Sequence, residues 1–120
     1  MLSDNVQIPL QEKHGRLLIV DDEEAVQQAL KRLFHRQYEV VALGSGAAAV
    51  ELLQQDEFDL IISDMRMPGM SGAELLKHCF EQYPDMIRIL LTGYSDLESA
   101  IKAVNEGNIY RYISKPWDND

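Results

Sequence analysis

The chain has 120 residues, which is the usual size of one domain and enough to bury a hydrophobic core. Its formal charge of −9 argues against nucleic-acid binding, because phosphates would be repelled. A lone cysteine, Cys79, excludes an internal disulfide framework, and the longest apolar runs are far too short to span a bilayer. We therefore expect a cytoplasmic domain with no membrane segment and no direct nucleic-acid binding.

The first residues, 1–15, have an early acid and no sustained apolar run, so they are interpreted as a short polar arm rather than a signal peptide. From Arg16 onward, short apolar runs with strand character alternate with segments that repeat at helical spacing. No repeat, low-complexity tract or linker interrupts residues 16–120, which are expected to form one domain.

Five strands are expected, at residues 17–20, 38–43, 60–63, 87–91 and 110–114. Because helical patterns separate them, they predict parallel βαβ units and a doubly wound α/β fold. Right-handed crossovers leave few topologies, and the flavodoxin-like strand order 2-1-3-4-5 suits five strands.

Four helices are expected between these strands, each with an apolar inner face. The inward residues are Val26, Leu30, Leu33 and Phe34; then Ala49, Val50 and Leu53; then Leu76, Cys79, Phe80 and Tyr83; and finally Ala100, Ile101 and Val104. Ser45 is expected to cap the second helix. The spacing of a capping box occurs at 71–74 and again at 95–98, and Gly107 is a natural helix end.

Polar residues directly follow four of the strands. They are Asp21 and Asp22 after the first, Asp64 after the third, Thr92 after the fourth and Lys115 after the fifth. In the order 2-1-3-4-5 the carboxyl ends of the first and third strands are adjacent, and ligands bind beyond such ends where the strand order switches. Five polar groups are therefore expected to converge at one edge of the sheet.

These groups suit phosphoryl chemistry. Three close carboxylates repel one another unless a divalent cation lies among them, and such oxygen ligands favour Mg²⁺. A carboxylate at this edge can act as a nucleophile toward phosphorus and give an acyl phosphate. The cation, a lysine and a hydroxyl would then hold the phosphoryl oxygens. Each group alone has a simpler explanation, such as helix capping by Asp21 and Asp22, so the combination carries the prediction.

Four motifs contain these residues: "IVDDE" (19–23), "IISDMRMPGMSG" (61–72), "LLTGYSD" (90–96) and "YRYISKPW" (110–117). With them the chain resembles the receiver domain of two-component response regulators, from Arg16 to Trp117. The resemblance implies a phosphorylation-dependent signalling switch rather than a turnover enzyme. It also implies that Asp64 accepts a phosphoryl group from a partner histidine kinase, a phosphotransfer protein or a small phosphodonor.

The resemblance also implies roles for the surrounding residues. Asp22 would ligate Mg²⁺ directly and Asp21 mainly through water, with Asp64 and the backbone carbonyl of Arg66 completing the protein ligands. Lys115 would pair with the phosphoryl oxygens.

Switching in this family implies that the hydroxyl of Thr92 moves toward the phosphoryl group. Tyr112 then changes rotamer and the helix after Thr92 shifts. Residues 96–107 and 110–114 would report the change to an output domain or partner.

Two further residues are expected to set the lifetime of the phosphoryl group. Arg66 and Tyr94 lie two places beyond Asp64 and Thr92, where receiver domains vary. Their bulk would shield the acyl phosphate from water, which predicts slow self-dephosphorylation.

The end of the chain departs from the family pattern. Receivers usually continue past the Lys-Pro motif into a fifth helix, whereas this chain stops at Asp120, so we expect that helix to be largely missing. Truncation of a longer regulator is the first explanation, and an intrinsically short protein is the alternative. The uncovered apolar patch favours a homodimer or a partner contact. The ending "EGNIYRYISKPW" resembles regulators with HD-type phosphodiesterase outputs and some with transcriptional outputs.

Two other functions fit parts of this pattern. A magnesium-dependent phosphatase of the haloacid-dehalogenase type also has a strand-end nucleophilic Asp, but it requires a second acid where this chain has Arg66. A flavin-binding module would need a phosphate-cradling loop after the first strand, where Asp21 and Asp22 would repel the phosphate.

Overall fold

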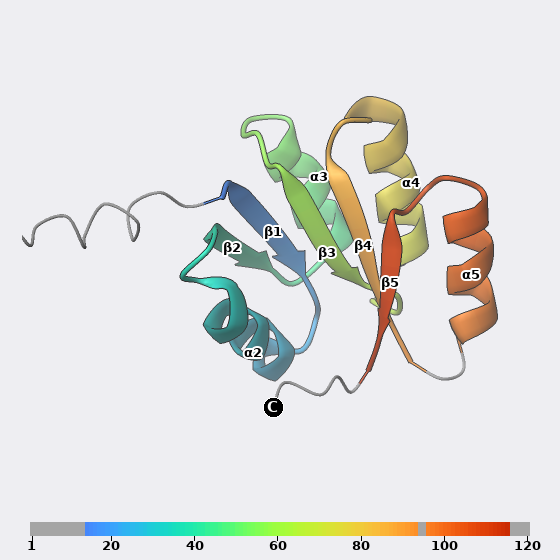
Figure 1. Cartoon of the computed structure of the whole chain (residues 1–120), viewed down its shortest axis with the longest axis horizontal. Coiled ribbons are helices and arrows are strands. Elements are labelled where there is room, and N and C mark those ends of the chain that lie inside the picture. The colour runs from blue at the N-terminus through green and yellow to red at the C-terminus, as the bar shows by residue number, and fades with distance from the viewer. Residues whose placement is uncertain (1–13, 94–95, 116–120) are drawn as a thin grey trace, which may run out of the picture.

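The computed structural model describes residues 14–93 and 96–115 (Figure 1). Its elements are β1 (Arg16–Val20), α2 (Glu24–Phe34), β2 (Glu39–Leu43), α3 (Gly46–Leu53), β3 (Leu60–Asp64), α4 (Gly72–Gln82), β4 (Ile87–Thr92), α5 (Leu97–Asn105) and β5 (Arg111–Ser114). The strands pair in parallel in the order β2-β1-β3-β4-β5. The predicted fold class and strand order are therefore confirmed.

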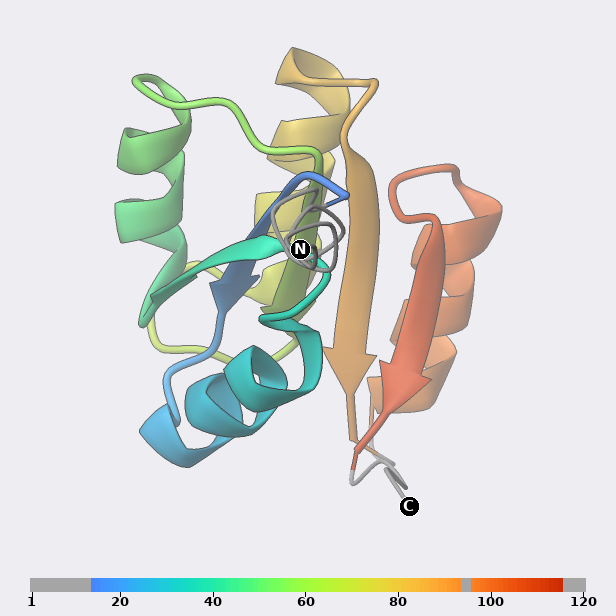
Figure 2. The same cartoon turned by 60° about the vertical axis from the view of Figure 1, so that its left-hand side comes forward.

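The helices cover the two faces of the sheet unequally. α3, α4 and α5 lie on one face and α2 lies on the other (Figures 1 and 2). Alternate side chains of one strand point to opposite faces, so Leu18 of β1 packs under α3 and α4, whereas Leu17 and Ile19 pack toward α2. β1 and β3 are thus buried on both sides, as central parallel strands require.

The predicted inner faces of the helices need three corrections. Leu33, Phe80 and Ile101 are 44%, 39% and 42% exposed, so their assignment to the core is wrong. In α4 and α5 the buried positions instead include Leu75 and Ala103. Helical periodicity gives the direction of an apolar stripe, but the neighbouring elements decide how wide a stripe they cover.

The predicted helix starts agree with the structure where it describes them. The hydroxyl of Ser45 accepts a hydrogen bond from the Ala48 N–H, and Ser71 and Glu74 form a complete capping box. α5 differs, because the side chain of its N-cap residue, Asp96, makes no capping hydrogen bond. Ser95, the predicted cap of this helix, lies outside the described residues.

Several predictions fall outside the described part of the chain. They concern most of the polar arm, residue 94 and the ending after Lys115.

Gly107 follows the end of α5 with a positive φ of 84°, as a helix-terminating glycine does. Among the described residues, no helix combines the length and the apolar character needed to cross a membrane.

Candidate functional site

Three aspartates meet at the carboxyl edge of the sheet. Asp21 and Asp22 follow β1, Asp64 ends β3, and these two strands are neighbours, with Val20 opposite Ser63. Carboxylate oxygens of the three acids all lie within 4.8 Å of one another. Asp21 and Asp64 are buried, whereas Asp22 is exposed. Three of the five groups that were predicted to converge, the aspartates, are thus close together.

Lys115 reaches the same acids from β5. Its backbone N–H donates to the Thr92 carbonyl at 2.8 Å, which continues the pairing of β4 with β5. Its Nζ lies 3.0 Å from an oxygen of Asp64 and 3.2 Å from an oxygen of Asp21. One ammonium group therefore bridges two buried carboxylates from different strands.

Burial and crowding shift the ionisation of these groups. Burial raises the pKa of Asp64; the charges of Asp21 and Asp22 raise it further, while the hydrogen bond from Lys115 opposes the shift. The pKa of Asp21 is raised too, mainly by burial. For Lys115, burial lowers the pKa, but its bonds to the two acids outweigh this and the pKa is raised overall. The site therefore has excess negative charge that one lysine does not neutralise.

Asp21 is held in place by the start of α2. Its Oδ1 accepts a hydrogen bond of 2.9 Å from the Glu23 N–H, and the Gln27 side chain donates to the Asp21 carbonyl at 2.7 Å. Gln27 lies one helical turn into α2. Its hydrogen bond to the Asp21 carbonyl therefore fixes the loop that carries Asp21 and Asp22. Sequence reasoning missed Gln27, since a polar helical residue next to a turn carries no distinctive signal.

The start of α4 packs directly against the backbone of Asp64. A Cβ atom added to Gly72 would lie 1.9 Å from the Asp64 carbonyl oxygen, so only glycine permits this close approach. The Gly72 N–H donates to the Met65 carbonyl at 2.8 Å. Gly72 stands in the quoted motif without an assigned role. Its position inside a helix start, where glycine has poor helix propensity, was the available signal.

Thr92 and Tyr112 lie on the adjoining strands. Thr92 is fully buried, and its hydroxyl donates to the Gly93 carbonyl at 3.2 Å. Tyr112 is partly buried and packs against the core beneath α3, α4 and α5. Their predicted switching roles remain predictions.

Arg66 points toward α5. Its guanidinium binds both carboxylate oxygens of Asp96, at 2.8 Å through Nε and 2.7 Å through Nη2. The hydrogen bonds from Arg66 lower the pKa of Asp96. The pairing of these two side chains could not be read from the sequence, because 30 residues separate them. Tyr94, the other predicted lifetime residue, lies outside the described residues.

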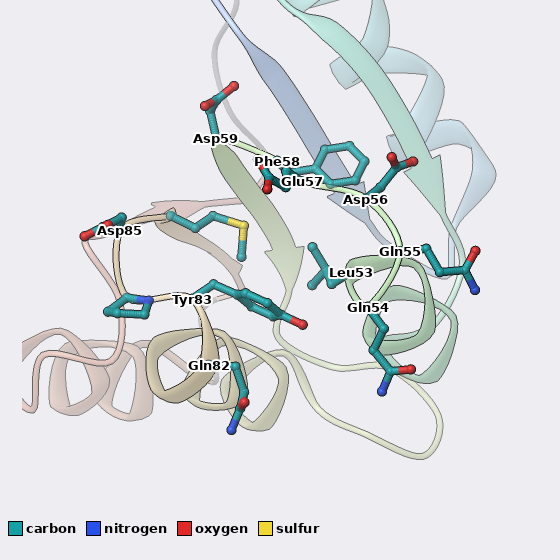
Figure 3. Close-up of a pocket in the computed structure, with 12 residues that line it drawn as sticks. Leu53, Gln54, Gln55, Asp56, Glu57, Phe58, Asp59, Gln82, Tyr83 and Asp85 are labelled. Atoms are coloured by element: carbon teal, nitrogen blue, oxygen red, sulfur yellow. The ribbon is translucent and has the colours of Figure 1, made fainter.

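A separate hollow of about 570 Å³ lies at the opposite end of the sheet, where β3 and β4 begin (Figure 3). Residues 53–59 and 82–86 line it, including Leu53, Tyr83 and Asp85. Two of its acids already have partners, because Asp59 accepts a hydrogen bond from the Arg16 N–H and Asp56 forms an ion pair with the Arg16 guanidinium. It contains none of the strand-end residues.

The family model of the response regulator receiver domain matches residues 17–120. The chain is 40% identical over 111 residues to a hydrogenase transcriptional regulatory protein, HoxA of Cupriavidus necator, covering 92% of this chain and 23% of the relative. It is 34% identical over 109 residues to the DNA-binding transcriptional regulator NtrC of Escherichia coli, covering 90% and 23%. The chain thus spans less than a quarter of these relatives.

Solved structures of receiver domains support the same family assignment. The signal receiver domain of an HD domain-containing protein from Pseudomonas fluorescens superposes with a TM-score of 0.79 at 42% identity, covering 90% of this chain and 86% of that one. A response regulator receiver domain protein from Clostridium thermocellum gives a TM-score of 0.80 at 33% identity, covering 86% and 83%. The chain belongs to the response regulator receiver domain family, a family of signalling modules rather than turnover enzymes.

Proposed function

We propose that Asp64 accepts a phosphoryl group from a histidine kinase or a small phosphodonor, and that this modification switches the domain. The observation that carries the proposal is the setting of the Asp64 carboxylate. It lies at the sheet edge, in contact with the Lys115 ammonium and close to the carboxylates of Asp21 and Asp22. In the reaction, an Asp64 oxygen forms a bond to phosphorus while the bond from phosphorus to the donor nitrogen or oxygen breaks.

Mg²⁺ is the cofactor that fits this site. Every ligand that the acid cluster offers is a carboxylate oxygen, which suits a hard divalent cation. Asp22, the exposed member, would ligate the cation directly, and Asp21, Asp64 and the Arg66 carbonyl would supply the remaining protein ligands, Asp21 mainly through water. When bound, the cation would neutralise negative charge on the acids and on the phosphoryl group.

The protein's own residues would then hold the modified side chain. Lys115 already contacts Asp64 and would keep an ammonium beside the phosphoryl oxygens. The Thr92 hydroxyl, now bonded to the Gly93 carbonyl, would turn to a phosphoryl oxygen. That movement would open space near Tyr112 and shift α5, so the surface of α5 and β5 would change.

An output domain or partner protein would read that surface. HoxA and NtrC are transcriptional regulators of which this chain matches only a part, which supports a transcriptional output. The similarity to a receiver domain of an HD domain-containing protein supports the other predicted output.

The test is phosphorylation with labelled acetyl phosphate and Mg²⁺. Asp64→Asn should abolish acid-stable, hydroxylamine-sensitive labelling, because the amide cannot form the acyl phosphate. Asp85→Asn, which removes an exposed acid at the other end of the sheet, is the matched control and should label like the original chain. Undiminished labelling of Asp64→Asn would refute the proposal.

A further inference from the structure

A bidentate ion pair joins the loop after β3 to the beginning of α5. Both Asp96 oxygens bind the Arg66 guanidinium, and the two residues differ sharply in exposure: 75% for the Arg66 side chain and 9% for that of Asp96. Bidentate pairing fixes the relative orientation of the two groups as well as their distance. The start of α5 is therefore tied to the loop that follows the candidate phosphorylation site, Asp64.

The other attachments of α5 near its start are weak. Its N-cap side chain, Asp96, makes no capping hydrogen bond, so the helix start lacks the bond that Ser45 and Ser71 provide in α3 and α4. The buried residues within α5 are Ala100 and Ala103, whose small side chains remove little apolar surface from water. Besides the Asp96 N–H, which donates to the Gly93 carbonyl at 3.1 Å, Arg66 supplies the side-chain contact that holds this helix start.

The other end of α5 is held differently. Arg88 of β4 is buried, and its guanidinium donates to the carbonyls of Asn108, Pro84 and Met86 at 2.8, 3.1 and 2.6 Å. Because Asn108 follows α5, this buried contact anchors the helix end to the sheet. One end of α5 thus has a buried anchor, and the other has an accessible ion pair.

Arg66 is also two residues from Asp64. A phosphoryl group carries about two negative charges near neutral pH and would compete for the guanidinium. The Arg66 side chain is 75% exposed, so few neighbouring atoms prevent it from leaving Asp96.

We propose that the Arg66–Asp96 pair is a latch: it holds the start of α5 in the unphosphorylated domain and opens when a phosphoryl group on Asp64 draws Arg66 away. The opening step rests on the proposed function of Asp64. The holding step does not, because it concerns only the unphosphorylated chain.

Amide hydrogen exchange of the first turn of α5 tests the holding step. Arg66→Gln and Asp96→Asn should each make these amides of the unphosphorylated protein exchange on the order of twofold to fivefold faster, the range expected for one exposed ion pair. The double variant should add little, since either change alone breaks the pair. Lys102→Gln is the matched control, because it breaks an exposed Lys102–Glu106 pair on the same helix. Exchange that is unchanged in both single variants would overturn the latch.

Beryllofluoride with Mg²⁺, which mimics the aspartyl phosphate, tests the opening step. In the original chain it should raise exchange in the first turn of α5, and in Asp96→Asn it should raise it much less. An equal increase in both proteins would overturn the competition for Arg66. Acetyl phosphate labelling is measured in parallel. If the original chain does not label, the proposed function fails, while the comparison of unphosphorylated variants still decides whether the pair holds α5.

Discussion

Helices α4 and α5 lie side by side on the same face of the sheet (Figure 1), but different kinds of contact hold their first turns. α4 begins with a complete capping box, packs Gly72 onto the Asp64 backbone and buries Leu75 and Leu76. α5 begins without a side-chain cap, buries alanines and depends on Arg66 from another loop. In the proposed switch, α4 would hold the site in place and α5 would move in response to it.

Gly72→Ala should have the largest effect on stability, because it disrupts the contact between α4 and the Asp64 backbone. The new methyl group would meet the Asp64 carbonyl oxygen, so α4 or the acid must move, at a cost of about 3 kcal/mol of stability. Urea denaturation measures the loss. At Gly44 an added Cβ would meet only a Gln27 side-chain atom at 3.9 Å, so Gly44→Ala should change stability by less than about 0.5 kcal/mol. Equal stabilities for the two variants would show that α4 is not fixed in this way.

The contacts at the two helix starts involve carboxylates whose pKa values are shifted in opposite directions, so the two should titrate in different pH ranges. Burial raises the pKa of Asp64 at the α4 contact, whereas Arg66 lowers that of Asp96 at α5. Ionised Asp96 therefore contributes stability above its unfolded pKa, and this contribution is lost as pH falls through its lower folded pKa. For Asp64 without metal, the contribution is present below the unfolded pKa and is lost as pH rises through the raised folded pKa.

Carboxyl carbon chemical shifts followed by NMR measure this order directly. In the metal-free protein, Asp64 should titrate at a higher pH than Asp96. Adding Mg²⁺ should lower the titration of Asp64 and leave that of Asp96 nearly unchanged, because a cation in the acid cluster favours ionised Asp64. The reverse order of titration would contradict the assignment of burial as the dominant influence on Asp64.

The smallest expected effect concerns the lifetime of the phosphoryl group on Asp64. Replacing Arg66 and Tyr94 together by serine should shorten the half-life of the phosphorylated domain, since both bulky side chains are expected to exclude water. Asp96→Asn keeps both residues and should retain the long half-life while releasing the start of α5. Dephosphorylation followed after removal of phosphodonor measures both. A half-life unchanged or lengthened in the serine variant would count against shielding.

Residue patterns alone were enough to predict the class of the fold, the strand order and the meeting of the strand-end acids. Strands 1 and 3 consist of apolar runs that end in acids, and parallel topology places the carboxyl ends of neighbouring strands together. The N-cap at Ser45 and the capping box at Ser71 could also be predicted, because capping depends on residues three positions apart.

The contacts that support the site could not be predicted from local patterns, because they depend on tertiary packing. The contact of Gly72 with Asp64 and the pairing of Arg66 with Asp96 join segments whose distance depends on how α4 and α5 settle on the sheet. The exposure of Ile101 and the burial of Ala103 were decided in the same way. Local patterns record which residues share a face, whereas the final contacts depend on the packing of whole elements against one another.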